Sequence, residues 1–157
     1  MLETTTNLKT MLSDPTLLET RAYVGGEWIG GDKGTFDVTN PARGDVVAQV
    51  ADLSREQVGV AIAKAEVAQK EWTKWSAKER SAVMRTWFNL MMENQDDLGI
   101  ILTAEMGKPL AEAKGEIAYG ASFVEFFAEE AKRIYGETIP GHQRDKRITV
   151  LKQPIGV

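Results

Sequence analysis

The stretch from Pro109 to Gly136, PLAEAKGEIAYGASFVEFFAEEAKRIYG, constrains the fold of this chain more than any other. Apolar residues recur in it at every third or fourth position, which is typical of one face of a helix. The proline suits a first helical turn, and the glycine suits the left-handed residue that closes a helix. The stretch therefore predicts one helix about 40 Å long, roughly the width of a domain.

The middle of this helix carries no charge between Ile117 and Val124. A helix that is apolar on every side is normally packed on more than one side. We therefore expect the rest of the chain to pack around it. Four aromatic residues follow the same helix: Tyr119, Phe123, Phe126 and Phe127. They could line an apolar pocket, but core packing is the preferred interpretation, as it is for Trp72 and Trp75.

Residues 1–20 are polar and predict a loose arm with one helical turn. The residues that follow, up to about residue 51, predict a small antiparallel β meander. The run RAYVGGEWI, residues 21–29, has a Gly-Gly pair between two β-prone segments, which is a hairpin signal. Residues 36–39 and 45–51 read as two further strands, and the Asn-Pro-Ala-Arg-Gly segment between them reads as a turn.

Three further helices are predicted before the long one. Ser54 with Gln57, and Ser76 with Glu79, have the spacing of capping boxes that begin helices. A third helix is expected over residues 95–105. Beyond the long helix, residues 137–141 predict a rigid turn and residues 147–153 predict a strand. The last residues, 154–157, are apolar and read as entry into a buried strand, so we expect the chain to be part of a larger protein.

Composition excludes several classes of function. A net charge of −4 gives a nucleic-acid partner no electrostatic support. The absence of cysteine excludes a disulfide, a thiolate metal site and a cysteine nucleophile within these 157 residues. No apolar run approaches the length of a membrane span, and the first residues lack a signal-peptide pattern. The expectation is therefore a cytoplasmic protein without a membrane partner.

No active site can be recognised from residue patterns alone. The single histidine, His142, lies in a polar loop and is interpreted as a surface residue. The many carboxylates of the long helix are interleaved with lysine and arginine, which is typical of solvated faces. Neither of the two common glycine-rich phosphate loops is present.

Four runs of the sequence resemble a known family. They are YVGGEWIGGDKGTFDVTNPARGDVVAQV, LTAEMGKPLAEAKGEI, FFAEEAKRIYGETIPG and LKQPIGV. From about residue 20 onwards the chain resembles the N-terminal third of an aldehyde dehydrogenase. The run RTWFNLMMENQDDL and the long helix are similar to the succinate-semialdehyde dehydrogenase branch, or to its relatives that act on glutarate semialdehyde.

The resemblance implies an α/β fold of which this chain holds the N-terminal part. That part would be mainly helical, with a small β meander, one oligomerisation strand and an incomplete Rossmann-type domain. Residues 1–20 would be an arm, and residues 21–137 would belong to the cofactor-binding domain. Residues 138–153 would contribute to an oligomerisation β element, and residues 154–157 would begin the first central strand. A homo-oligomer, dimer or tetramer, is implied for the complete enzyme.

The resemblance also implies a chemistry, the oxidation of succinate semialdehyde to succinate with NAD or NADP. In the family a cysteine thiolate attacks the aldehyde, hydride passes to the nicotinamide, and a glutamate activates the water that hydrolyses the thioester. An asparagine side chain and a backbone N–H stabilise the oxyanion. All the matching positions lie beyond Val157. We therefore expect no catalytic residue, no cofactor binding and no turnover from this chain alone, and the choices between NAD and NADP and between succinate and glutarate semialdehyde stay open.

Two sets of residues match functional positions of the family. Gly115, Tyr119 and Phe123 match positions on the helix that lines the mouth of the substrate tunnel. Val38 and Glu105 match positions whose main-chain oxygens hold a structural monovalent cation in some members. Ordinary packing is the competing interpretation of both sets, and it is the preferred one for the cation pair because the family's further ligand falls beyond Val157.

Two functional hypotheses follow. The chain is a piece of a semialdehyde dehydrogenase, or it is a non-catalytic module that docks on full-length subunits through its helices and the strand of residues 147–153. An unpaired edge of that strand would favour such association.

Overall fold

The computed structural model describes residues 8–157. It contains four helices and six short strands in that range: α1 Arg55–Trp72, α2 Ala77–Glu93, α3 Gln95–Met106 and α4 Leu110–Glu130, with β1 Ala22–Val24, β2 Glu27–Ile29, β3 Thr35–Thr39, β4 Val46–Ala51, β5 Glu137–Pro140 and β6 Arg147–Val150. Two short 3₁₀ helices, η1 Leu8–Met11 and η2 Pro15–Leu17, precede them. The expected class, mainly helical with small antiparallel strand pairs, is confirmed.

The starts of α1 and α2 follow from their first residues. The Ser54 hydroxyl accepts the Gln57 N–H at 3.2 Å, and the Gln57 side chain accepts the Ser54 N–H at 3.0 Å. Ser76 and Glu79 make the same reciprocal pair at α2. Both capping boxes predicted from the sequence are therefore confirmed, and each satisfies N–H groups that a helix start leaves without a partner.

The long helix α4 is shorter than its sequence pattern predicts. Pro109 lies outside the first turn as the N-cap residue, and the helix ends at Glu130. Lys132 and Arg133 donate to carbonyls only three residues back, so the chain leaves the helix there. The prediction that Gly136 caps the helix is wrong, because its φ is not positive. A Cβ at Gly136 would lie 2.2 Å from the Val150 carbonyl oxygen, so the glycine serves the close approach of β6.

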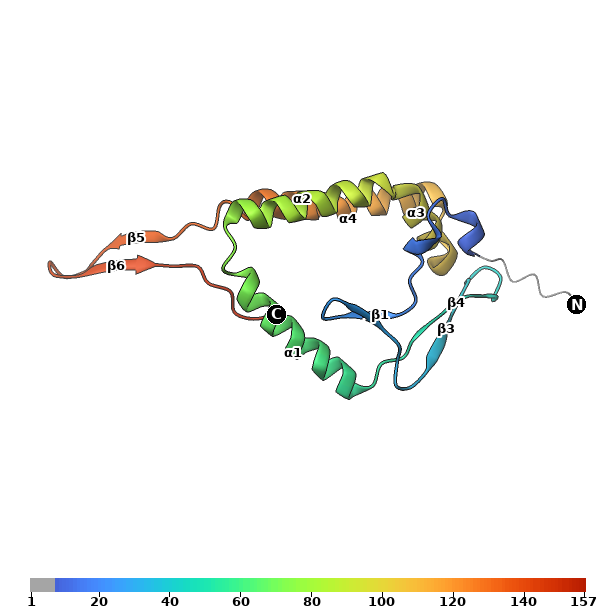
Figure 1. Ribbon diagram of the computed structural model, residues 1–157. Helices are drawn as coiled ribbons and strands as arrows, with labels where there is room; N and C mark the ends of the chain where they lie inside the picture. The colour runs from blue at the N-terminus through green and yellow to red at the C-terminus, as the bar shows by residue number, and fades with distance from the viewer. Residues whose placement is uncertain (1–7) are drawn as a thin grey trace, which may run out of the picture.

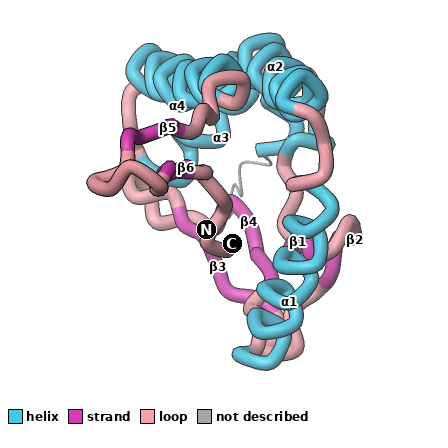
Figure 2. The backbone as a smooth tube through the Cα atoms, turned by 90° about the vertical axis from the view of Figure 1, so that its left-hand side faces the viewer, coloured by secondary structure: helices cyan, strands magenta, loops and turns pink. Residues whose placement is uncertain are grey.

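The helices α2 and α4 lie side by side, and α3 packs across the start of α4 (Figure 1). The contact surface of α4 is made of small residues: Ala113, Ala121 and Ala128 are fully buried. Small side chains let neighbouring helix backbones approach closely. The helix α1 lies away from this pair, as both backbone views show (Figure 2).

The prediction that the middle of α4 is buried and packed on more than one side is confirmed only in part: α2 and α3 both pack on the helix, but its aromatic residues are exposed. Tyr119 is 64% exposed and Phe123 is 48% exposed, and Phe126 and Phe127 are also exposed. These aromatic side chains are therefore not core, and Phe127 lines a surface pocket together with Trp72 and Met84. Trp75 is likewise exposed, and it stacks on the half-buried Trp72 at 5.3 Å between ring centroids.

The strands form three separate antiparallel pairs, β1–β2, β3–β4 and β5–β6. The predicted hairpin of residues 21–29 is confirmed, and Gly25 and Gly26 both have positive φ in its turn. The predicted continuous meander is wrong, because the loop that follows Ile29 separates β2 from β3. A backbone bond from the Ala51 N–H at the end of β4 to the Thr20 carbonyl, at 2.9 Å, links β4 to the segment before β1.

The β5–β6 hairpin projects from the end of the α2–α4 pair (Figure 1). Residues 137–140 form a strand, so the prediction of a rigid turn there is wrong; Glu137 pairs with Val150 and Pro140 with Arg147. The predicted strand of residues 147–153 is confirmed but ends at Val150, and residues 151–157 lie outside any strand. No described helix is both long enough and apolar enough to cross a membrane.

The described part of the N-terminal arm is not loose. Leu8 and Leu12 are buried, and η1 packs on α3. The buried carboxylate of Asp97, in the first turn of α3, accepts the N–H groups of Ser13 and Asp14. The sequence predicts one helical turn in the arm but no attachment of the arm to α3; residues 1–7 of the expected arm lie outside the described residues.

Candidate functional site

The helix α4 places the three residues matched to the substrate tunnel on one exposed face. Gly115, Tyr119 and Phe123 are four residues apart, so they follow each other along the same side of the helix. The rings of Tyr119 and Phe123 meet edge to face, with centroids 5.0 Å apart and planes at 87°. A Cβ built on Gly115 would meet no atom within 4 Å. The structure thus brings the three residues together on a surface, and their contact with substrate stays a prediction.

The opposite side of α4 packs against its neighbouring helices, and this leaves the aromatic face exposed. Ala121 has no exposed surface on a helix that packs against α2 and α3, whereas Tyr119 and Phe123 are exposed. An exposed apolar surface with several aromatic side chains normally marks a place where another molecule or segment binds. Chemically, the face offers an apolar wall and one phenol; the described residues around it include no cysteine and no pair of carboxylates in an apolar setting.

Arg85 locks α2 against α4 beside this face. Its Nη1 donates to Glu125 Oε1 at 2.5 Å and its Nη2 donates to Glu129 Oε1 at 2.8 Å. The Arg85 guanidinium, with a contribution from Lys132, lowers the pKa of the Glu129 carboxyl below its usual value. The same guanidinium lies 5.4 Å from the centre of the Phe88 ring. This partly exposed interhelical fork links α2 to α4.

The central α4 carboxylates are partly exposed, as expected for a solvated face, but their partners lie on other segments and not along α4. Glu116 pairs with Lys108 before the helix, and Lys114 pairs with Asp96 of α3 at 2.7 Å. A within-helix charge pattern cannot show which partner lies on a neighbouring helix. Only Lys132 and Arg133 keep the expected partners three residues away, Glu129 and Glu130.

The two segments that carry Val38 and Glu105 come close to each other. Glu105 lies in the last turn of α3, whose carbonyls lack helical partners, and Val38 lies beside the bulge of the β3–β4 pair. A Cβ on Gly107 would lie 2.8 Å from Cγ of Pro41, so the two turns are in contact. Two main-chain oxygens are fewer than a cation bound by oxygen normally takes. The described residues do not by themselves make a cation site, and the assignment of this pair stays a prediction.

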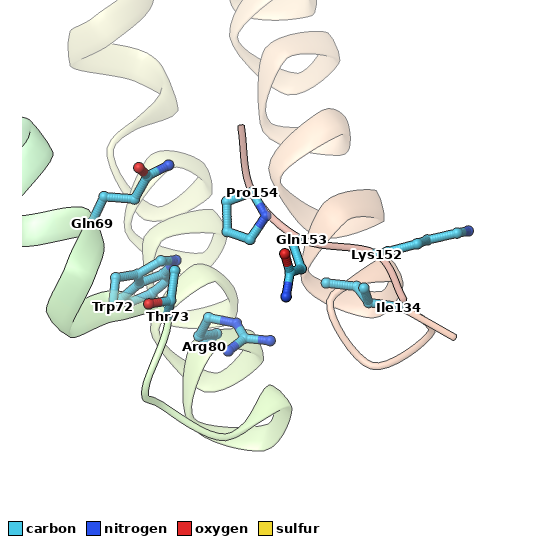
Figure 3. Close-up of a pocket in the computed structure, with 8 residues that line it drawn as sticks. All are labelled: Gln69, Trp72, Thr73, Arg80, Ile134, Lys152, Gln153 and Pro154. Atoms are coloured by element: carbon cyan, nitrogen blue, oxygen red, sulfur yellow. The ribbon is translucent and has the colours of Figure 1, made fainter. Parts of the chain in front are cut away.

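A pocket of about 500 Å³ lies elsewhere, between the α1–α2 junction and residues 152–154. Figure 3 shows Arg80 and Gln153 extending into the space beside Trp72, while Lys152 points away from it. Gln69 ties α1 to the last residues, since its Nε2 donates to the Gly156 carbonyl at 2.6 Å. Trp72, for which core packing was the preferred interpretation, lines this pocket, whereas none of the residues matched to functional positions of the family does. His142 is exposed in the loop between β5 and β6, in line with its interpretation as a surface residue.

Comparison with known proteins gives a consistent result. Residues 28–157 match the model of the aldehyde dehydrogenase family. A glutarate-semialdehyde dehydrogenase of Pseudomonas putida is 58% identical over 147 residues, which are 93% of this chain and 31% of that protein. The NADP-dependent succinate-semialdehyde dehydrogenase of Escherichia coli is 55% identical over 147 residues, 93% of this chain and 30% of that protein.

The fold agrees with the sequence match. The crystal structure of succinate-semialdehyde dehydrogenase from Burkholderia pseudomallei superimposes with a TM-score of 0.89 at 51% identity, over 92% of this chain and 30% of that one. The chain thus spans about a third of the length of the relatives it matches, and it matches their N-terminal part. With the family model covering most of its residues, the chain belongs to the aldehyde dehydrogenase family.

Proposed function

We propose that this chain supplies the N-terminal part of an NAD(P)-dependent dehydrogenase that oxidises succinate semialdehyde to succinate. The observation that carries the proposal is the identity of 55–58% to semialdehyde dehydrogenases across 93% of the chain. Glutarate semialdehyde is the alternative substrate, since relatives with both names are similar to the chain to nearly the same degree.

The role proposed for the chain is structural support and substrate contact. The exposed face of Gly115, Tyr119 and Phe123 would form one wall of the substrate passage, and the aromatic rings would exclude water from it. The Arg85 fork would hold that wall in place through Glu125 and Glu129. Bond making and hydride transfer would rest on residues outside this chain, because it holds no thiol for the covalent step.

The test is a chimera in which this chain replaces the equivalent part of the Escherichia coli enzyme. The folded chimera should reduce NADP in the presence of succinate semialdehyde, and Tyr119→Ala in it should raise KM for the aldehyde more than it lowers kcat. Ala111→Ser, an exposed change elsewhere on α4, is the control. A correctly folded chimera that oxidises neither semialdehyde would refute the proposal. Turnover by the 157-residue chain alone would refute the proposal that the catalytic residues lie outside this chain.

A second candidate is the non-catalytic module that docks on full-length subunits. Its support is the amount of apolar surface left uncovered, including Trp87 at 57% exposure and Ile155 with no cover at all. Mixing the chain with an intact relative and measuring mass by light scattering separates the candidates: a stable mixed complex without any gain of activity would favour the module.

A further inference from the structure

Two neighbouring pockets meet around Trp72, Arg80 and Ile134, which line both of them. The larger has a volume of about 500 Å³ and the smaller a volume of about 290 Å³. Their walls come from the end of α1, the first two turns of α2, the end of α4 with the residues after it, and residues 152–154 beyond β6. Pockets that bind small organic molecules are typically about 300–1,000 Å³. The tertiary structure therefore builds a combined site of a size that suits such a molecule.

Much of the wall of this site is apolar and flat. Trp72 is half-buried, and Trp75 stacks on it with ring centroids 5.3 Å apart, so the Trp72 indole is supported from behind. Met84 and Phe127 line the smaller pocket, and Pro154 lines the larger one. A supported indole favours an aromatic ring as its contact, because aromatic rings pair face to face with an offset or edge to face.

Arg80 supplies the positive charge of the site. Figure 3 shows its side chain extending into the space beside Trp72, and Gln153 reaches into the same space from another segment. Arg80 Nη1 donates to the Trp75 carbonyl, which positions the guanidinium. Arginine has five N–H donors, so others are available for a ligand. Among residues 8–157, no carboxylate forms an ion pair with Arg80.

The charge balance of the site favours an anion. Glu130 is the carboxylate among the described residues that line it, and its Oε1 already accepts from the Arg133 guanidinium at 2.8 Å and 2.9 Å. Lys152 points away from the space but adds a second positive charge at its rim. A cationic ligand would therefore be repelled by Arg80, whereas an anionic one would find a charged donor without a competing acid.

We propose that this site binds a small aromatic carboxylate, with its ring against Trp72 and its carboxylate on Arg80 and Gln153. The planar guanidinium suits a carboxylate, to which it can donate two parallel hydrogen bonds. Gln69 holds the last segment beside α1, since its Nε2 donates to the Gly156 carbonyl at 2.6 Å. The site shares no residue with the α4 positions matched to the substrate tunnel, so it goes beyond the proposed function.

The test is isothermal titration calorimetry of the 157-residue chain with 1-naphthoate and with its uncharged analogue 1-naphthamide. Wild type should bind naphthoate about tenfold more tightly than naphthamide, because hydrogen bonds to a charged group are the stronger ones. Arg80→Gln should bind naphthoate about tenfold more weakly and should lose the preference for naphthoate over naphthamide. Lys78→Gln is the matched control, since it removes one positive charge from an exposed position of α2 that does not line the site, and it should keep both affinities.

Gln153→Ala answers the question if the change at Arg80 prevents folding, because Gln153 is exposed and lies outside any helix or strand. It should weaken naphthoate binding about twofold to tenfold by removing a neutral hydrogen bond. Tyr119→Ala, on the exposed face of α4, should leave binding unchanged. No binding of naphthoate at millimolar concentration, equal affinities of wild type for the two probes, or a loss of binding in Tyr119→Ala in place of the Arg80 and Gln153 variants would overturn the proposal.

Discussion

The fully buried Ala121 in the contact between α4 and its neighbours gives the sharpest test of the packing. Its side chain has no exposed surface, and small residues recur at Ala113 and Ala128 on the same side. Ala121→Leu would add three carbon atoms where the helices already touch. Overpacking of a filled contact costs about 1–3 kcal/mol, because the helices must separate or side chains must leave their preferred rotamers.

The assay is urea unfolding of the chain followed by circular dichroism, with the m-value checked for a change in mechanism. The control is Ala111→Leu, which makes the same substitution at an exposed position of α4. The control should change the free energy of unfolding by less than about 0.5 kcal/mol. A melting temperature lowered by about 2–4 °C per kcal/mol should accompany the change at Ala121. Equal effects of the two leucines would refute the close approach of α4 to α2 and α3.

Three further predictions follow from local contacts. Ser76→Ala should cost about 1 kcal/mol in the urea assay by removing the cap of α2, and Ser76→Thr should keep most of it; no difference between the two would contradict the capping role. Gly136→Ala should speed hydrogen exchange in β5–β6, because its Cβ would meet the Val150 carbonyl, whereas Gly59→Ala, with open space around it, should not. The pKa of Asp97 is lowered by folding, so its contribution is present above the unfolded pKa, about 3.9, and is lost as pH falls through the folded value. The urea midpoint of wild type should therefore fall below pH 4 more steeply than that of Asp97→Asn, and parallel curves would exclude the effect.

The exposed aromatic face is consistent with the proposed function. Exposing the apolar surface of Tyr119 and Phe123 to water has a free-energy cost, and the described elements leave about half or more of each side chain exposed. In the proposed enzyme the same face would meet the aldehyde and the segments outside this chain. The matched segments of the relatives make up about a third of their length.

Local chemistry determined much of this structure in advance. The serine and its partner three residues later are sufficient to begin α1 and α2, because both groups of a capping box are close in the sequence. The Gly25–Gly26 turn could be predicted for a similar reason, because glycine has no Cβ and adopts the positive φ of such a turn without steric cost. The resemblance to the aldehyde dehydrogenase family could also be inferred from the sequence, from runs such as EMGKPLAEAKGEI, and the family match confirms it.

Tertiary structure decided how much of α4 is covered. The middle of the helix is apolar on every side, so the sequence could not show that Ala121 would be buried while Tyr119 and Phe123 stay exposed. The partners of Arg85 and Asp97 were hidden for a related reason: they lie 40 and more than 80 residues away, and a charge pattern along one helix carries no information about contacts at such a distance.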